Sequence, residues 1–176
     1  MSSTVNIDMC LIASKNLLPI EIMHSIFLDT LNELKGEIKN DILFINDKKI
    51  GTIYLKDRIL VRTDSELTQE VEKTTEKLRT TFSRRAQVEI DNYAYYLKKE
   101  KERIEKTGVD INEVNKDIGI IDKKIEDQQK AIKRQEMSSC EAIVEEIKEA
   151  AENQGYEVIE EKTNSGVQLQ FVRRTY

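Results

Sequence analysis

The stretch from residue 111 to residue 132 carries apolar side chains at alternating steps of three and four. This is the heptad pattern of a coiled coil, and a stripe this narrow is buried only by a partner helix packed along it. We call the stripe the seam. Gln128 occupies one of its apolar positions, where it either fixes the register of two helices or marks the point at which they diverge toward the rest of the protein. The a positions are Ile111, Ile118, Ile125 and Ile132, and the d positions are Val114, Ile121 and Gln128.

The stretch that precedes the seam supplies the partner helix, because its apolar residues also recur at steps of three, four and seven. Gly108 then predicts a helix end with a left-handed backbone, and Asp110 begins the spacing of a capping box for the next helix. The pattern therefore predicts a tight corner at residues 106–110. We expect the two helices to form an antiparallel coiled-coil hairpin over residues 66–137, which we call the arm.

The two ends of the chain show the apolar–polar alternation of half-buried strands. A first helix begins at Pro19, and a last helix follows a break in the heptad phase near Met137. The expected strands are residues 5–13, three short strands within 41–61, and a closing hairpin of residues 156–161 and 167–172.

The simplest arrangement of these elements places all the strands in one sheet, with the first and last helices on one face. The predicted fold class is therefore α+β: a mostly antiparallel sheet with packed helices and a long inserted antiparallel coiled-coil hairpin. We expect residues 1–65 and 138–176 to form the body and residues 66–137 to form the arm.

Charged residues make up 35% of the chain, yet the formal net charge is only −5, which does not favour a duplex-binding protein. The two cysteines, Cys10 and Cys140, are too few and too far apart for a disulfide framework. The chain shows neither a basic-then-apolar leader nor an apolar run of about 18 residues. These features favour a cytoplasmic protein.

The residue pattern offers little for catalysis. His24 is the single histidine, and it has no nearby cysteine or second histidine with which to form a base–nucleophile pair or a zinc site. Acidic pairs such as Glu145-Glu146 are more typical of a solvated helix face than of paired acid–base chemistry. The sequence therefore predicts no catalytic residue, no cofactor, no metal and no enzymatic activity.

One stretch, from Arg79 to Arg103, interleaves basic and aromatic residues, as nucleic-acid-binding surfaces do. Acidic residues are interspersed at helical spacing, so ion pairs within the arm explain the same pattern. Our first expectation is an adaptor or assembly subunit that engages protein partners, or itself, through the arm or the sheet edge. The alternative is a nucleic-acid-associated factor that uses this basic face. The expected partner-binding residues are Arg84, Arg85, Tyr93, Tyr96, Ile118 and Ile125.

Residues 141–176 resemble the end of an uncharacterised family of small cyanobacterial, plastid and phage proteins. The shared features are a helix, a glycine–aromatic turn at Gly155-Tyr156, a Glu-rich strand, a turn at Gly166 and a closing strand that ends in Arg173-Arg174. The family has a Tyr-Ala-Tyr run just before its last helix, whereas here Tyr93-Ala94-Tyr95 lies far upstream. The resemblance implies a similar α+β body and no particular activity.

Overall fold

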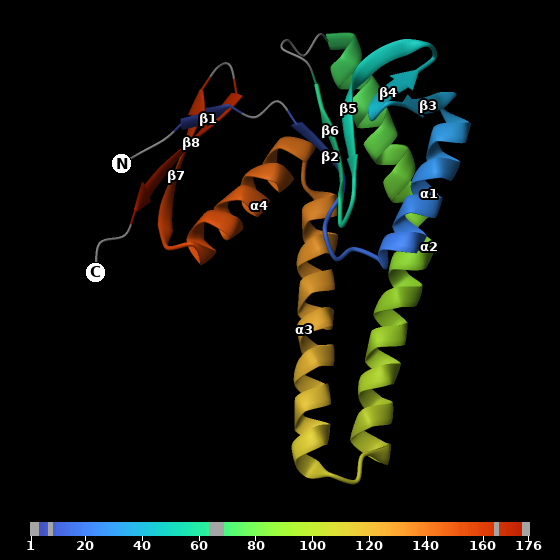
Figure 1. Ribbon diagram of the computed structural model, residues 1–176, viewed down its shortest axis with the longest axis vertical. Helices are drawn as coiled ribbons and strands as arrows, with labels where there is room; N and C mark the ends of the chain where they lie inside the picture. Colours follow the sequence, from blue (N-terminus) through green and yellow to red (C-terminus); the bar gives the residue numbers. More distant parts are fainter. Residues whose placement is uncertain (1–3, 7–8, 64–68, 164–165, 174–176) are drawn as a thin grey trace.

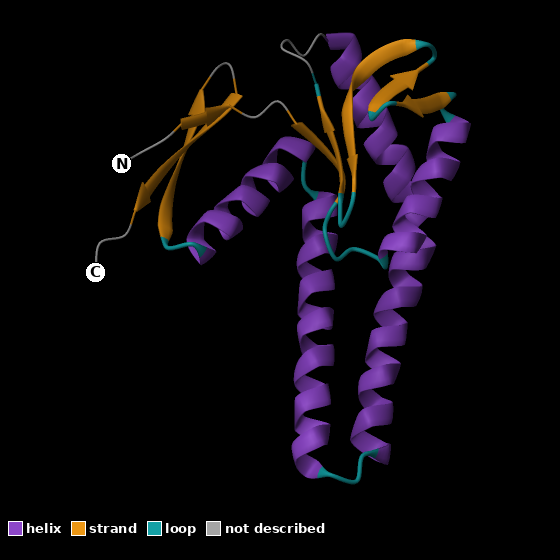
Figure 2. Cartoon of the chain, viewed as in Figure 1, coloured by secondary structure: helices purple, strands orange, loops and turns teal. Residues whose placement is uncertain are grey.

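The computed structural model describes residues 4–6, 9–63, 69–163 and 166–173, which form an α+β fold (Figures 1 and 2). The predicted fold class is confirmed. The helices are α1 (Ile20–Glu33), α2 (Gln69–Thr107), α3 (Ile111–Glu136) and α4 (Ser139–Asn153). The strands are β1 (Thr4–Asn6), β2 (Met9–Ala13), β3 (Gly36–Lys39), β4 (Ile42–Ile45), β5 (Lys48–Leu55), β6 (Ile59–Arg62), β7 (Tyr156–Thr163) and β8 (Gly166–Arg173).

The larger sheet is antiparallel and has the strand order β2-β6-β5-β4-β3. Two of its connections are two-residue turns, Asn40-Asp41 and Asn46-Asp47, in which all four residues have a positive φ. This geometry is that of type I′ hairpin turns, and it favours Asn and Asp. The sequence predicted the second turn but not β3, because four residues with one strongly apolar side chain, Ile38, are too few to show an alternation.

The main hydrophobic core lies between one face of this sheet and two helices, α1 and the first half of α2 (Figure 1). Phe27 of α1 and Phe82 of α2 are both completely buried in it. The apolar residues of α2, at i, i+4 and i+7 spacing, therefore pack against the sheet in the first half of the helix and against α3 in the second half. The other α2 residues of this core are Leu78, Ala86 and Ile90, and the strands contribute Leu43, Ile53 and Val61 among others.

The expectation of one sheet was wrong, because β1 and β2 belong to two different sheets. β1 pairs with β8 in a second antiparallel sheet of order β1-β8-β7, whereas β2 pairs with β6. Alternating side chains show that a segment is extended, but they do not show which strand it pairs with. The closing hairpin was predicted correctly, since β7 and β8 pair from Tyr156↔Arg173 to Thr163↔Gly166.

The last helix does not share a face of the sheet with α1, so that expectation was also wrong. Ile12 of β2 points into the main core, whereas Leu11 points to the other side and packs against Ala142 and Ile143 of α4. α4 therefore lies between the two sheets (Figure 1).

The antiparallel helical hairpin is present as α2 and α3 (Figure 2). Asp110 caps α3 by accepting hydrogen bonds from the backbone N–H of Asn112 at 2.9 Å and of Glu113 at 3.4 Å. The left-handed backbone predicted at Gly108 was wrong, because among the described glycines only Gly155 has a positive φ, 87°. A Cβ at Gly108 would instead lie 2.0 Å from Cγ2 of Val114, so the corner requires glycine for close packing. The predicted start of the arm, residue 66, lies outside the described residues.

Candidate partner-binding surfaces

The seam is covered by α2 of the same chain. On α3, Ile121 is 6% exposed, and Ile118 and Ile125 are half-buried on the same stripe. Leu97 of α2 is also buried, and an ion pair of 2.7 Å between Lys101 and Asp122 crosses from one helix to the other. Two of the predicted partner-binding residues, Ile118 and Ile125, therefore lie in the intramolecular seam, with their outer sides accessible.

Two glutamines join the base of the arm to the body. The Gln128 side chain donates hydrogen bonds of 3.2 Å to the backbone carbonyls of Leu17 and Ile90. Gln135 lies seven residues later; it donates to the carbonyl of Ile12 at 2.7 Å and accepts from the backbone N–H of Ser14 at 3.2 Å. Gln128 thus lies where α3, α2 and the loop before α1 meet, at the base of the arm. Sequence reasoning missed Gln135, although its position one heptad beyond Gln128 was a signal for it.

Arg79 is a structural residue rather than part of a surface. It is 6% exposed, and its guanidinium donates to the backbone carbonyl of Leu11 at 2.8 Å and to those of Arg134 and Gln135 at 3.0 Å. The last two carbonyls belong to the final turn of α3, where the helix dipole favours a cation. Burial lowers the pKa of Arg79. The spacing of Arg79 from the core residue Phe82 was the sequence signal for its burial.

The exposed cations of the basic–aromatic stretch are largely paired with carboxylates. Arg84 donates to both carboxylate oxygens of Glu33 at 2.9 Å, and Arg85 approaches the same carboxylate at 3.3 Å. The hydrogen bond from Arg84 holds the pKa of Glu33 below its usual value. Further ion pairs are Lys99–Glu102, Lys101–Asp122 and Arg103–Glu100. This face therefore presents balanced charge rather than a basic field.

The predicted tyrosines lie together on α2. The rings of Tyr93 and Tyr96 stack with their centroids 6.3 Å apart and an interplanar angle of 15°. Tyr93 is half-buried, and burial raises the pKa of its hydroxyl, whereas Tyr96 is 57% exposed. Tyr93 also lines a hollow of about 310 Å³ between the arm and the start of α1, together with Ile20 and Lys124.

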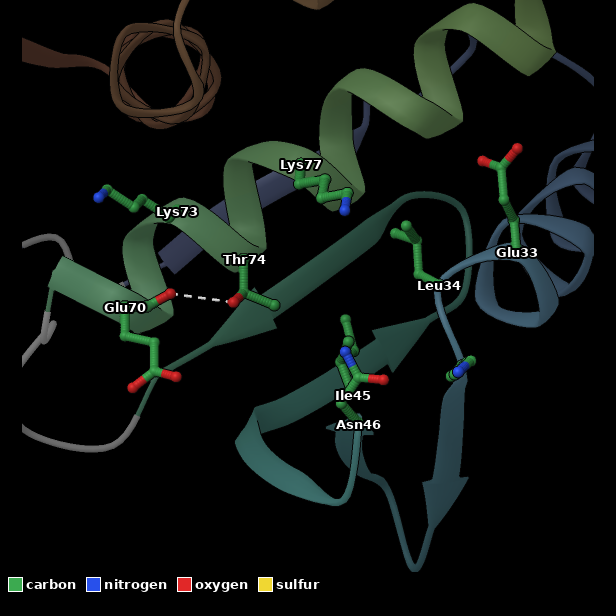
Figure 3. A pocket seen from close by; sticks show the side chains of 9 residues that line it. Glu33, Leu34, Ile45, Asn46, Glu70, Lys73, Thr74 and Lys77 are labelled. Atoms are coloured by element: carbon green, nitrogen blue, oxygen red, sulfur yellow. Dashed lines mark hydrogen bonds between the residues drawn. The ribbon is translucent and has the colours of Figure 1, made fainter.

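A larger hollow of about 420 Å³ lies between the end of α1, the turn after β4 and the start of α2 (Figure 3). Leu34 and Ile45 provide its apolar lining. Its carboxylates are engaged by cations, since Glu33 binds Arg84 and Glu70 pairs with Lys48. These lining residues include no histidine or cysteine, so the hollow lacks the usual partners for nucleophilic catalysis.

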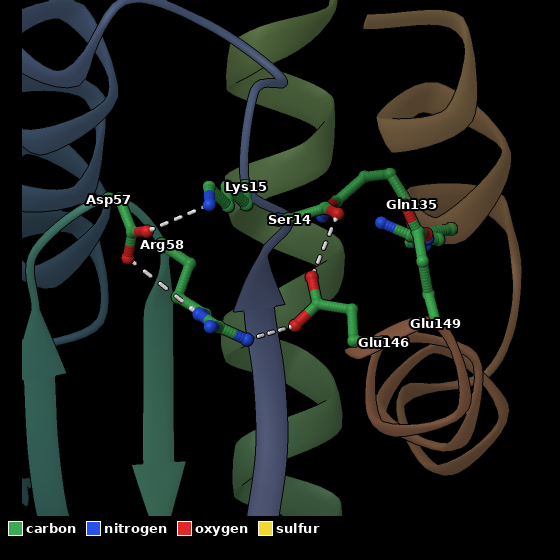
Figure 4. A network of polar contacts seen from close by, with 8 residues as sticks. Ser14, Lys15, Asp57, Arg58, Gln135, Glu146 and Glu149 are labelled. Carbon is green, nitrogen blue, oxygen red and sulfur yellow. Dashed lines mark hydrogen bonds and ion pairs between the residues drawn. The ribbon is translucent and has the colours of Figure 1, made fainter. Parts of the chain in front are cut away.

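A polar cluster connects α4 to the body (Figure 4). The Glu146 carboxylate pairs with Arg58 and accepts a hydrogen bond of 3.3 Å from the hydroxyl of Ser14. Arg134 of α3 pairs with Glu149 of α4. Ser14 is completely buried, so its hydroxyl is not accessible to a substrate. We therefore interpret the cluster as the polar part of the α4 interface.

Other kinds of site are not evident in the part of the chain that the structure describes. It contains no group of three or more His, Cys, Asp and Glu residues able to hold a metal ion. None of its helices is long and apolar enough to cross a membrane. His24, the single histidine, contacts the carbonyl of Lys56 at 3.0 Å.

Comparison with known proteins identifies no relative: no family model, no curated protein and no solved structure matches the chain. The resemblance of residues 141–176 to an uncharacterised family stays a prediction. Any proposal of function for this protein therefore rests on the geometry of its own surfaces.

Proposed function

We propose that the protein is a non-enzymatic adaptor or assembly subunit that binds a helix of a protein partner along one flank of its arm. The observation that carries the proposal is the row formed by Ile111, Ile118 and Ile125 on α3. Their seven-residue spacing places them on one flank over about 21 Å, at roughly 1.5 Å per residue. Ile111 is 73% exposed, and the other two are half-buried by α2.

A two-helix hairpin shields only one side of such a row. A third helix with apolar residues at heptad spacing would cover the other side, and this is a common way in which an amphipathic helix is recognised. Val109 lies at the tip next to the row and is completely exposed. Other apolar side chains exposed on the two helices are Val88, Tyr95, Tyr96 and Ile120.

The distal part of the arm, residues 94–122, is free to receive such a helix. It contributes no residue to either hydrophobic core of the body. Its described ion pairs, such as Lys101–Asp122 and Arg103–Glu100, join residues of the arm to each other. Exposed apolar residues gathered on a projecting element are typical of protein-interaction sites.

The test is site-specific photocrosslinking from position 111, with position 120 as the matched control. Ile120 is 51% exposed on the same helix but lies outside the row. In the native cells, we expect the probe at position 111 to give an adduct that maps to a helical segment of another protein. An adduct with a second copy of this chain would show self-association instead. No adduct, or equal adducts from both positions, would contradict docking on this flank.

Nucleic-acid binding is the weaker proposal, because Arg79 is buried and Arg84 and Arg85 share the carboxylate of Glu33. Charge reversal at Arg84 and Arg85 tests it. Loss of nucleic-acid retention, with a steep salt dependence, would favour this alternative over a protein partner.

A further inference from the structure

The two sheets differ in how their edges are protected. The outer edge of β2 is covered by side chains: the N–H of Leu11 donates to Ser139 at 2.7 Å, and the Leu11 carbonyl accepts from Arg79 at 2.8 Å. The opposite edge, β3, has four residues, of which Glu37 and Lys39 are charged and exposed. Short strands, charges and covering side chains are the usual means of preventing strand addition.

β7 also carries exposed charges, but it is not a short strand. It is eight residues long and pairs along its whole length with β8 on one side, and no described strand pairs with its other side. Backbone N–H and C=O groups on an unpaired strand edge are a template for another strand. In Figure 1, β7 and β8 lie beyond α4, away from the arm. This edge is therefore a second surface, independent of the flank proposed above.

The charge of β7 indicates which strand fits it. Glu157, Glu160 and Glu161 are all exposed, and only Glu160 has a described cation partner, Lys148 at 3.5 Å. Glu157 and Glu161 lie on the same face of the strand, on either side of Ile159, which is 47% exposed. Basic residues opposite the two glutamates would give favourable cross-strand pairs.

The same charges disfavour a second copy of β7. An antiparallel pairing of residues 156–162 with themselves sets Glu157 opposite Glu161. A pairing of residues 157–163 sets Glu160 opposite itself. Like charges directly opposite each other destabilise a strand pair. The occupant is thus a basic strand from another protein rather than a second copy of this chain.

The other face of β7 has room for an apolar side chain. Tyr156 of β7 and Phe171 of β8 line a hollow of about 370 Å³ with Ile147 and Ala151 of α4. Because side chains alternate along a strand, an added strand places every second residue on this face, which α4 partly covers. A groove between an edge strand and a helix is a recurrent place for strand addition.

We propose that the free edge of β7 binds an extended segment of a protein partner, in which basic residues alternate with apolar ones. The bound segment extends the smaller sheet through backbone hydrogen bonds. Its basic side chains lie beside Glu157 and Glu161, and its apolar side chains lie on the face of the hollow next to α4.

The test uses a fluorescent peptide of alternating lysine and valine and the full-length protein, with fluorescence anisotropy as the readout. We expect saturable binding, and about tenfold weaker binding to the double variant E157K/E161K, since two attractive pairs become repulsive. The matched control is E105K/E136K, which makes the same charge change on exposed residues of α2 and α3 and leaves binding unchanged. The variant I111K on the arm also leaves peptide binding unchanged. The proposal for β7 can therefore fail without the proposal for the arm, and the reverse is also true.

Backbone methylation distinguishes strand addition from general attraction. A peptide N-methylated at every second residue, on the edge that would face β7, keeps its charge but loses its donors. We expect it not to bind, and we expect the unmodified peptide to protect β7 amides from hydrogen exchange. Binding of the methylated peptide, equal weakening by the control variant, or no binding at all would overturn the proposal. The proposal would also be overturned if the wild type had twice the 20.5 kDa chain mass in solution and E157K/E161K lost this doubling. That result would assign the edge of β7 to a second copy of the chain.

Discussion

Replacement of Arg79 by methionine tests whether this buried cation holds the arm to the body. Its guanidinium serves three backbone carbonyls, those of Leu11, Arg134 and Gln135, in a site that is 6% exposed. Methionine fills a similar space but donates no hydrogen bond. The variant therefore keeps most of the packing and removes the polar contacts.

The expected loss follows from these three acceptors. The carbonyl of Arg134 also accepts a hydrogen bond from the N–H of Met137 at 3.3 Å, so it keeps one donor in the variant. The carbonyls of Leu11 and Gln135 each lose a charged donor, and a buried acceptor left without its donor costs about 1–3 kcal/mol. The free energy of unfolding of R79M should therefore fall by about 4 kcal/mol, a large share of the total for a domain of this size.

Urea unfolding followed by circular dichroism measures this change, because urea does not screen charges. Arg84 provides the matched control: it lies on the same helix, but its ion pair with Glu33 is exposed. R84M should change the free energy of unfolding by less than about 0.5 kcal/mol. R79K should be intermediate, because a lysine ammonium does not reproduce the fork of donors. A loss below about 1 kcal/mol in R79M, or an equal loss in R84M, would refute the structural role of Arg79.

Two further predictions concern the arm corner and the surface of α2. G108A should lower the thermal midpoint of unfolding because its Cβ meets Val114. The added change V114A should restore much of the loss. No rescue would show that contact with Val114 is not the reason the corner requires glycine. The lowered pKa of Glu33 implies stability that is present above its unfolded pKa and is lost as the pH falls through the lower folded pKa. Between about pH 5 and pH 3 the wild type should therefore lose more stability than R84Q, whereas K98Q should follow the wild type, and equal slopes for all three would contradict this reasoning.

The candidate surfaces were only partly accessible to sequence reasoning. The row of isoleucines on α3 follows directly from its heptad spacing. The neutralisation of Arg84 did not, because Glu33 lies 51 residues away in sequence, on α1. The free edge of β7 was not predictable either, because a strand is at an edge only if no other strand of the fold pairs with its second side. A local pattern contains no information about either relationship.

Most local elements, including the two helices of the arm and the corner between them, were determined by the sequence itself, whereas β3 was not. Apolar spacing, the cap at Asp110 and the phase break near Met137 act within a few turns of helix, so they can be recognised without the fold. The closing hairpin belongs to the same class, because its strands are adjacent in the chain.

Only the tertiary structure decided how these elements meet. The apolar–polar alternation of residues 5–13 would be the same whether they paired with one sheet or with two. In the fold, β1 pairs with β8 and β2 pairs with β6, and α4 packs between the two sheets. Arg79 and Gln135 are the same types of residue as exposed arginines and glutamines on the same two helices, so residue type does not distinguish them. They are buried because the ends of α3 and β2 bring backbone carbonyls to them, and a buried carbonyl requires a donor.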